Sequence, residues 1–192
     1  MEATRATLPP GVVDLIDKGY GFWYPTAAAG VTPAVVGVNS APMLWNPSDS
    51  GVKLKILRIR YGAVSGTVIL AHIGYGIFAN CGSQIGTAQP VVSHTLVPAT
   101  NARYGNGRVS KIRFAPATVT MTVGPVYRMP NGMSSGGALA AGPLYTLEDK
   151  VDGDITIDPG NAFFPFISNA ALALVAAVAV LALEIPISDP IV

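Results

Sequence analysis

Two histidines and one cysteine are the side chains in this chain that most often carry catalysis or bind a metal. His72 and His94 each lie in an apolar, strand-like stretch, with no cysteine or carboxylate nearby at the spacing of a metal site. Cys81 has no partner for an internal disulfide, which fits a protein assembled in a reducing cytosol. The phosphate-binding pattern GxxxxGK[ST] and the zinc pattern HExxH do not occur. We therefore predict a protein that is not an enzyme and that has no catalytic or cofactor-binding residue.

A short acidic stretch offers the best candidate for a metal site. Asp152, Asp154 and Asp158 could supply oxygen ligands to a hard cation such as Ca²⁺. The stretch departs from an EF-hand loop, because Thr156 stands where a third ligand is needed and no glutamate closes the loop. A solvated turn explains the same residues without a metal, and we predict no metal-binding residue here.

Basic side chains gather on two strand-like stretches. They are Lys53, Lys55, Arg58 and Arg60 on the first, and Arg108, Lys111 and Arg113 on the second. A basic sheet face suits nucleic-acid phosphates, but the net charge is only +1 and no aromatic residues are interleaved with the basic ones. Residues 1–147 carry 11 Lys and Arg against 4 Asp and Glu, whereas residues 148–192 carry 1 against 7. These opposite charges could pair, within the fold or between neighbouring subunits, and a pattern that serves only solubility explains them equally well. We expect no nucleic-acid partner.

The scarcity of charge indicates what surrounds the protein. Only 12% of the 192 residues are charged, about half the usual fraction. A compact monomer of this mass would expose about 8,600 Å² of surface, so its few charges would leave large uncharged areas that favour association. The longest apolar run, Ala170–Leu183, is shorter than the roughly 17 residues that a membrane helix needs. We therefore expect much of the surface to be covered by copies of the chain or by a partner, with no membrane segment and no signal peptide.

Short strands separated by turns are expected along most of the chain, because 21 Gly and 16 Pro recur through the apolar segments. The clearest strand is VKLKILRIRYG, residues 52–62, in which the alternation slips by one residue at Ile56 and Leu57. The slip indicates either a β-bulge or a point where both faces become buried, and it would place Lys53 and Lys55 on the face opposite Arg58 and Arg60.

Further strands are expected at 68–75, 91–96, 109–114, 119–123, 145–147, 154–157 and 162–167. Residues 170–183 are compatible with a helix or with strands. We favour two strands, because residues 181–187 alternate cleanly and Pro186 would stop a helix. This rhythm predicts an all-β fold, a β-sandwich or jelly roll, in a domain that spans residues 44–192.

Residues 1–43 differ from the rest of the chain. Their prolines and glycines interrupt regular structure, yet Phe22, Trp23 and Tyr24 make them too apolar for a disordered tail. We predict an extended N-terminal arm that lies on another surface, with these three aromatic residues as partner-binding anchors. An edge strand of the chain's own fold explains residues 31–38 equally well. If the arm is separate, removal of residues 1–40 should leave a folded β domain.

Two segments resemble structural proteins of tailed-bacteriophage virions. The first is residues 44–75, where Trp45-Asn46-Pro47 and a Ser50-Gly51 turn precede an alternating strand and the turn Ser65-Gly66-Thr67. The second is ITIDPGNAFFPFISNAA followed by LALEIPI, in which a Pro-Gly turn precedes two closing strands. Together the two segments cover about a third of the chain.

The resemblance implies a jelly-roll or β-sandwich virion protein, commonly a homotrimer, that acts as a capsid decoration or cement protein or in a head fibre. Such a protein would bind the major capsid protein on the capsid surface, after synthesis in the host cytoplasm, and would bridge neighbouring capsid subunits. The resemblance makes Trp45-Asn46-Pro47 a structural turn, in which Asn46 bonds within the turn and Trp45 packs beneath it.

An alternative in the same context is a phage tail or fibre protein that binds a host receptor or glycan. A glycan site needs an aromatic platform with polar neighbours, and one loop offers this combination. Its residues are Asn101, Arg103, Tyr104 and Asn106. A plain polar turn is the competing explanation for the same loop.

Overall fold

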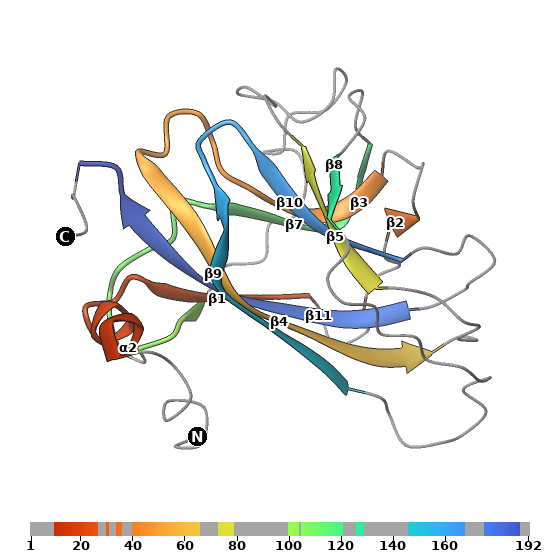
Figure 1. The fold of residues 1–192 in the computed structure, drawn as a ribbon, viewed down its shortest axis with the longest axis horizontal. Coiled ribbons are helices and arrows are strands. Elements are labelled where there is room, and N and C mark those ends of the chain that lie inside the picture. Colours follow the sequence, from red (N-terminus) through yellow and green to blue (C-terminus); the bar gives the residue numbers. More distant parts are fainter. Residues whose placement is uncertain are drawn as a thin grey trace.

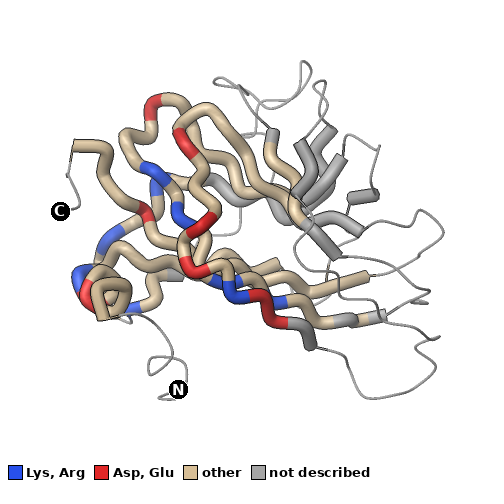
Figure 2. The backbone as a smooth tube through the Cα atoms, in the orientation of Figure 1, with Lys and Arg blue, Asp and Glu red and all other residues tan. Residues whose placement is uncertain are grey.

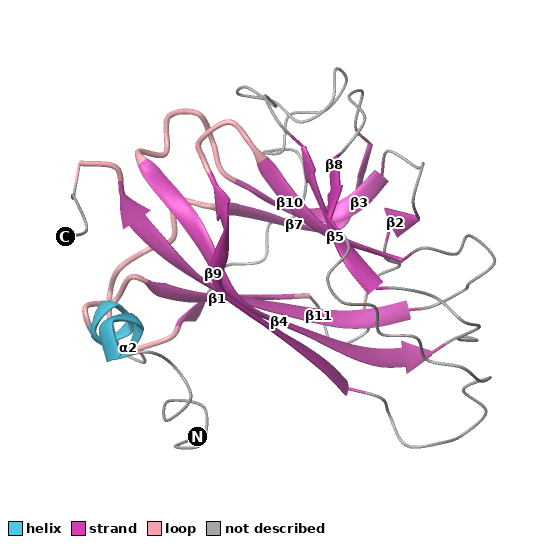
Figure 3. Cartoon of the chain, in the orientation of Figure 1, coloured by secondary structure: helices cyan, strands magenta, loops and turns pink. Residues whose placement is uncertain are grey.

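The computed structural model describes residues 10–26, 30, 34–35, 40–65, 73–78, 100–103, 105–120, 126–128, 146–167 and 175–188. These residues form an all-β fold of two facing sheets with one short helix (Figures 1 and 3). The all-β prediction is therefore confirmed. His72, Cys81, His94 and Tyr104 lie outside the described residues, as does the strand expected at 91–96.

The first sheet has five strands. Their order across the sheet is β6 (Thr100–Asn101), β1 (Gly21–Pro25), β11 (Val175–Pro186), β4 (Val52–Ser65) and β9 (Thr146–Ile157). Every neighbouring pair in this sheet is antiparallel.

The second sheet has six strands. Its main order is β7 (Arg113–Thr120), β3 (Ser40–Trp45), β10 (Ala162–Ile167), β5 (Ile73–Phe78) and β8 (Val126–Arg128). The short strand β2 (Ala34–Val35) runs parallel to β10, and the other pairs are antiparallel.

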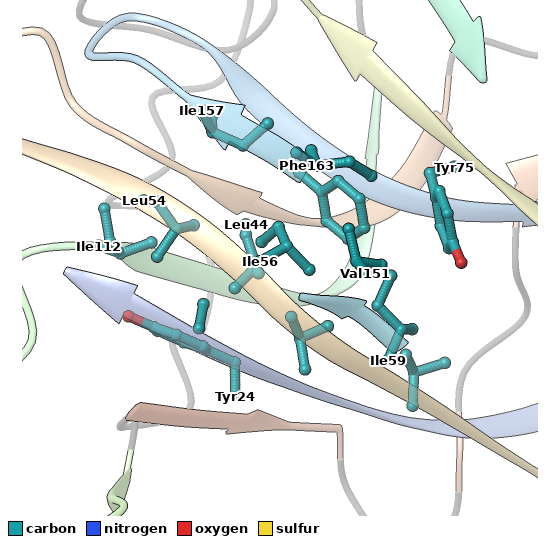
Figure 4. Packing of buried hydrophobic residues seen from close by; sticks show 14 of the residues in the cluster. Tyr24, Leu44, Leu54, Ile56, Ile59, Tyr75, Ile112, Val151, Ile157 and Phe163 are labelled. Atoms are coloured by element: carbon teal, nitrogen blue, oxygen red, sulfur yellow. The ribbon is translucent and has the colours of Figure 1, made fainter. Parts of the chain in front are cut away.

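The main hydrophobic core lies between the two sheets (Figure 4). Tyr24 of β1 and Leu54 of β4 come from the first sheet, while Leu44 of β3 and Phe163 of β10 come from the second, and all four are almost fully buried. Alternation along each strand places every second side chain in this layer. Burial of apolar surface, at about 25 cal/mol per Å², is the main force that holds the sheets together.

A β-bulge explains the phase slip in β4. Ile56 and Arg58 pair with consecutive residues of β11, so Leu57 is an extra residue in the ladder. Ile56 and Ile59 consequently both face the core, whereas Leu57 belongs to a second apolar cluster on the outer face. The bulge therefore keeps the apolar side chains of β4 inward on both sides of the slip.

The same bulge corrects one expectation. Lys53, Lys55, Arg58 and Arg60 all lie on the outer face of the five-stranded sheet, because their neighbours Val52, Leu54, Ile56, Ile59 and Tyr61 fill the core. They do not lie on opposed faces.

Helix α2 (Pro10–Asp17) covers part of the outer face of the five-stranded sheet. Its Ile16 packs against Leu57 of β4 and the cluster residues Leu181, Leu183 and Ile185 of β11. The sequence did not predict this helix, because Pro10 and Gly11 indicate an interruption of regular structure. Proline is tolerated in a first helical turn, where its missing N–H has no intrahelical partner to lose.

Gly19 ends the helix. Its N–H donates to the carbonyl of Ile16, the N–H of Tyr20 donates to the carbonyl of Leu15, and Gly19 has φ +84°. This is a Schellman arrangement, which favours glycine because the left-handed region strains other residues. A Cβ at Gly19 would also lie 2.2 Å from Nδ2 of Asn106.

We expect Gly19→Ala to destabilise the protein by about 2 kcal/mol, because it combines backbone strain with this overlap. The loss is measured by chemical denaturation. Gly11→Ala is the matched control, since a Cβ there meets nothing within 4 Å and lies in a helix. An equal effect at both glycines would contradict the role given to Gly19.

The extended arm predicted for residues 1–43 is not confirmed. Of the described residues in this range, 10–17 form α2, 21–25 form β1 between β6 and β11, and β3 begins at Ser40. Phe22 and Tyr24 of this segment lie in the chain's own core, and Trp23 between them lies on the outer face. The prolines and glycines of the segment gave no sign of this. Removal of residues 1–40 would take out an internal strand, so we now expect that truncation to prevent folding.

Several strand boundaries also differ from the prediction. The strands expected at 145–147 and 154–157 are one strand, β9, and the described part of the C-terminal stretch is a single strand, β11. The strand expected at 52–62 continues three residues further, since β4 ends at Ser65. The prediction at 162–167 is confirmed residue for residue as β10.

Candidate functional site

A buried carboxylate of the five-stranded sheet binds the segment between β6 and β7. Glu184 of β11 is only 1% exposed. The Tyr24 hydroxyl donates to its Oε1 over 2.6 Å, the Ser110 hydroxyl also donates to Oε1, and the Lys111 backbone N–H donates to Oε2 over 3.0 Å. Three donors replace the water that the carboxylate loses on burial. Glu184 thereby holds the segment after β6 against the end of the sandwich.

Burial raises the pKa of the Tyr24 hydroxyl well above its ordinary value, and the neighbouring charge of Glu184 raises it further. Tyr61 behaves similarly, because burial raises its pKa well above the ordinary value and the charge of Asp149 adds to the effect. Both hydroxyls are therefore held in the neutral form.

This predicts a specific alkaline instability. The folded pKa of each tyrosine is above its unfolded value of about 10, so the stabilisation is complete below that pH and is lost as pH rises towards the folded pKa. We expect the free energy of unfolding to fall above pH 10 by up to about 1.4 kcal/mol per pH unit for each group. Denaturant titrations at several pH values measure this slope, and Tyr61→Phe should reduce it by one group. A slope that is unchanged in Tyr61→Phe would refute the assignment.

The described residues of the loop considered for glycan binding contact the end of helix α2. Asn101, which is buried, donates from Nδ2 to the carbonyl of Gly19 over 2.9 Å and accepts from the N–H of Arg103. The Arg103 guanidinium donates to the carbonyl of Asp17, and Asn106 accepts from the N–H of Arg108. The amides thus stabilise the helix end and their own turns, as the polar-turn alternative expects.

The same region carries exposed basic side chains. Lys18, Arg103 and Lys111 are exposed, and the Arg108 guanidinium lies 4.0 Å from the centre of the Tyr20 ring. Val109 is 81% exposed between Arg108 and Ser110. We call Lys18, Arg103, Arg108 and Lys111 the basic edge, because they flank β6, an edge strand of the sheet.

On the outer face, β4 pairs its charges with β9. Glu148 accepts from Arg58 over 3.2 Å and from Arg60 over 2.8 Å, and Lys53 lies 3.4 Å from Asp158. Of the two arrangements expected for opposite charges, the described residues therefore show pairing within the fold. The pair between Lys53 and Asp158 is exposed and contributes under about 1 kcal/mol, whereas the Arg58 side chain in the other group is buried.

The acidic stretch forms an irregular edge. Between the residues that pair with Ile56 and Arg58 of β4, β9 has an insertion that includes Asp152 with φ +49° and Gly153 with φ +91°. Asp152 and Asp154 are exposed there, and Asp158 follows the strand. Within the described ranges, no three Asp, Glu, His or Cys residues are grouped so as to hold a metal ion.

Asp149 faces inward from β9, unlike its acidic neighbours. It accepts a hydrogen bond from the Tyr75 hydroxyl of the second sheet. Burial raises the pKa of Asp149, while a hydrogen bond with the Lys150 backbone lowers it. The contact links β9 of the first sheet to β5 of the second.

The Trp45-Asn46-Pro47 turn follows β3 and lies beside the start of β4 and the end of β9. The Asn46 Nδ2 donates to the carbonyls of Val52 and Ile157 over 2.8 and 2.9 Å, and its Oδ1 accepts from the Ser50 hydroxyl over 2.5 Å. Asn46 is 0% exposed and Trp45 is 3% exposed. Asn46 therefore bonds within its turn as expected, but it also joins β4 to β9, which the sequence did not indicate.

The three predicted anchor residues lie on opposite faces of β1. Phe22 and Tyr24 are 0% exposed and lie in the core between the sheets. Trp23 points to the outer face, where it is half-buried beside α2 and lies 5.2 Å from the Arg60 guanidinium. Phe22 and Tyr24 could contact a partner only if β1 left its sheet, so Trp23 alone lies where a partner can reach it.

The described fold defines an all-β protein in which two facing sheets enclose one main core. No family model, curated protein or solved structure matches this chain. Among the described residues, no helix is long and apolar enough to cross a membrane.

Proposed function

We propose that the two sheets form a jelly roll. Its eight strands would be β1, β3, β4, β5, β8, β9, β10 and β11, with β2, β6 and β7 as additions. In chain order the first pairs with the last, the second with the seventh, the third with the sixth and the fourth with the fifth. The contacts β11–β4 and β10–β5 then join these pairs into two sheets. Nested pairing of this kind supports a jelly roll, because it follows from winding one long hairpin into a sandwich.

The function that fits this architecture best is that of a virion structural protein, a capsid decoration or cement protein. Jelly rolls recur in viral capsid proteins, and the strand order is the observation that carries the proposal. The low content of charged residues adds support, because a surface with few charges suits lasting contact with neighbours. The protein would form a homotrimer and bind the major capsid protein on the outside of a phage head.

The proposed mechanism is mechanical and not enzymatic. A protein that bridges neighbouring capsid subunits stabilises the lattice by adding buried area across their joint. About 400 Å² of apolar contact, at about 25 cal/mol per Å², supplies about 10 kcal/mol before the entropic cost of association. Glu184 is consistent with such a role, because its three donors come from the fold itself and hold it in place.

Two measurements test the proposal. Light scattering should give three times the chain mass of 19.8 kDa. Gold-labelled antibody against the protein should then mark the heads of virions made by the phage that encodes it. Label at the tail tip or fibres would favour the receptor-binding alternative. A monomer that labels no part of the particle would overturn both functions.

A further inference from the structure

The two edges of the five-stranded sheet carry opposite charge. At one edge, beside β6, the basic edge contributes four positive charges. Asp14 and Asp17 of α2 and the buried Glu184, which contacts Ser110 and Lys111, contribute three negative charges, which leaves +1. Figure 2 shows these basic residues around the end of α2 and along the segment that follows β6. Between Asp49 and Glu148 the sequence contains no acidic residue, and Glu184, the carboxylate that reaches this segment from β11, is buried.

At the other edge, β9 carries the acidic residues that remain after pairing within the fold. Glu148 and Asp158 are occupied by Arg58, Arg60 and Lys53. Asp152 and Asp154 make no ion pair with a described residue, although the Lys55 chain passes near Gly153. Lys150, also exposed on β9, offsets one of their two negative charges. We call Asp152 and Asp154, which are both exposed, the acidic edge.

We propose that copies of this chain associate head to tail, with the basic edge of one copy against the acidic edge of the next. This inference rests on the proposed homotrimer and names the surfaces that form it. A ring of three copies needs a heterologous contact, in which two different surfaces of each chain meet. Opposite edges of one sheet provide two such surfaces, and their charges are complementary.

Side chains, and not a continued β-ladder, make this contact. β6 is only two residues long, and the insertion in β9 interrupts its backbone at Asp152 and Gly153. Short strands and bulges both block the addition of another strand. The same insertion places Asp152 and Asp154 in solvent, where they are available to basic side chains of a neighbour.

The charges set orientation, and apolar contact adds affinity. An exposed ion pair contributes under about 1 kcal/mol and is screened by salt. Val109, 81% exposed at the centre of the basic edge, supplies apolar surface that a neighbouring copy would cover. Association should therefore weaken with salt without being abolished by it.

A charge exchange tests the proposal in the full chain. Lys18→Glu with Lys111→Glu takes the charge of the basic edge from +4 to 0, so that the neighbouring carboxylates make this side net negative, and it leaves the contacts of Arg103 and Arg108 intact. Asp152→Asn with Asp154→Lys reverses the acidic edge, and asparagine tolerates the positive φ at position 152. In the variant with all four substitutions, the side of the sheet near β6 is negative and the side near Asp152 is positive. Asp49→Lys, in the exposed turn between β3 and β4, is the control.

Sedimentation across a concentration series measures association, and circular dichroism with thermal unfolding checks each fold. We expect each double variant to weaken association at least about tenfold, and the fourfold variant to recover most of the loss. Undiminished association in both double variants, or wild-type association that does not respond to salt, overturns the edge contact and leaves the proposed trimer standing. A wild-type protein that is monomeric at every concentration overturns the trimer itself.

Discussion

Replacement of Asn46 by alanine is expected to lower the free energy of unfolding by about 3 to 4 kcal/mol. The substitution leaves the carbonyls of Val52 and Ile157 and the hydroxyl of Ser50 without their partner in a fully buried site. Each buried polar group that loses its partner costs about 1 to 3 kcal/mol. Urea denaturation followed by circular dichroism measures the change.

Two further variants separate the bonds of this residue. Ser50→Ala removes the hydroxyl that donates to Asn46 and accepts from the Val52 N–H, and we expect a loss of about 1 to 2 kcal/mol. Asn46→Asp keeps the shape but replaces the donor with a carboxylate oxygen facing two carbonyls, so it should cost at least as much as alanine. If Asn46→Ala and Ser50→Ala were equally mild, the amide would not join β4 to β9.

Replacement of Glu184 by alanine is the second change with a large expected effect, a loss of about 3 to 5 kcal/mol. The substitution leaves the hydroxyls of Tyr24 and Ser110 and the N–H of Lys111 without their hydrogen-bond acceptor. Glu184→Gln should cost less, about 2 kcal/mol, because one oxygen remains as an acceptor while its NH₂ group faces a donor. Chemical denaturation gives these differences.

Hydrogen exchange distinguishes this role from a general loss of packing. The Lys111 amide should exchange faster in Glu184→Ala than in the wild type, by more than amides of β10 do. Lys111→Ala is the matched control, because its side chain is exposed and its N–H still reaches Glu184. Unchanged stability together with an unchanged rate at Lys111 would show that the carboxylate does not hold this segment.

Local sequence patterns predicted those strands whose structure follows from the alternation of their own residues. The slip in β4 was visible as two alternating runs joined at Ile56 and Leu57, and it is a bulge. Residues 162–167 form β10 because an apolar run follows a Pro-Gly turn. Strand character in 175–186 follows from alternation that outweighs the helix propensity of alanine and leucine.

Long-range partners could not be predicted in this way. The glutamate in an apolar strand was a visible sign of a buried carboxylate at position 184, but its partners Tyr24 and Ser110 lie 160 and 74 residues away. Helix α2 was missed because its apolar side chains make sense only against the outer face of β11. The aromatic residues of β1 were read as anchors for a partner because nothing local identifies the strands that enclose them.

The pairing of β1 with β11 constrains how the protein is made. β1 lies in the sheet between β6 and β11, and the bond between Tyr24 and Glu184 spans 160 residues. During translation, Phe22, Trp23 and Tyr24 leave the ribosome long before the strand that completes their sheet exists. Contacts so distant in sequence form slowly, and the exposed apolar strand is prone to aggregate while it waits. We therefore expect the yield of soluble protein to depend on synthesis rate and chaperone supply more than on the stability of the finished fold.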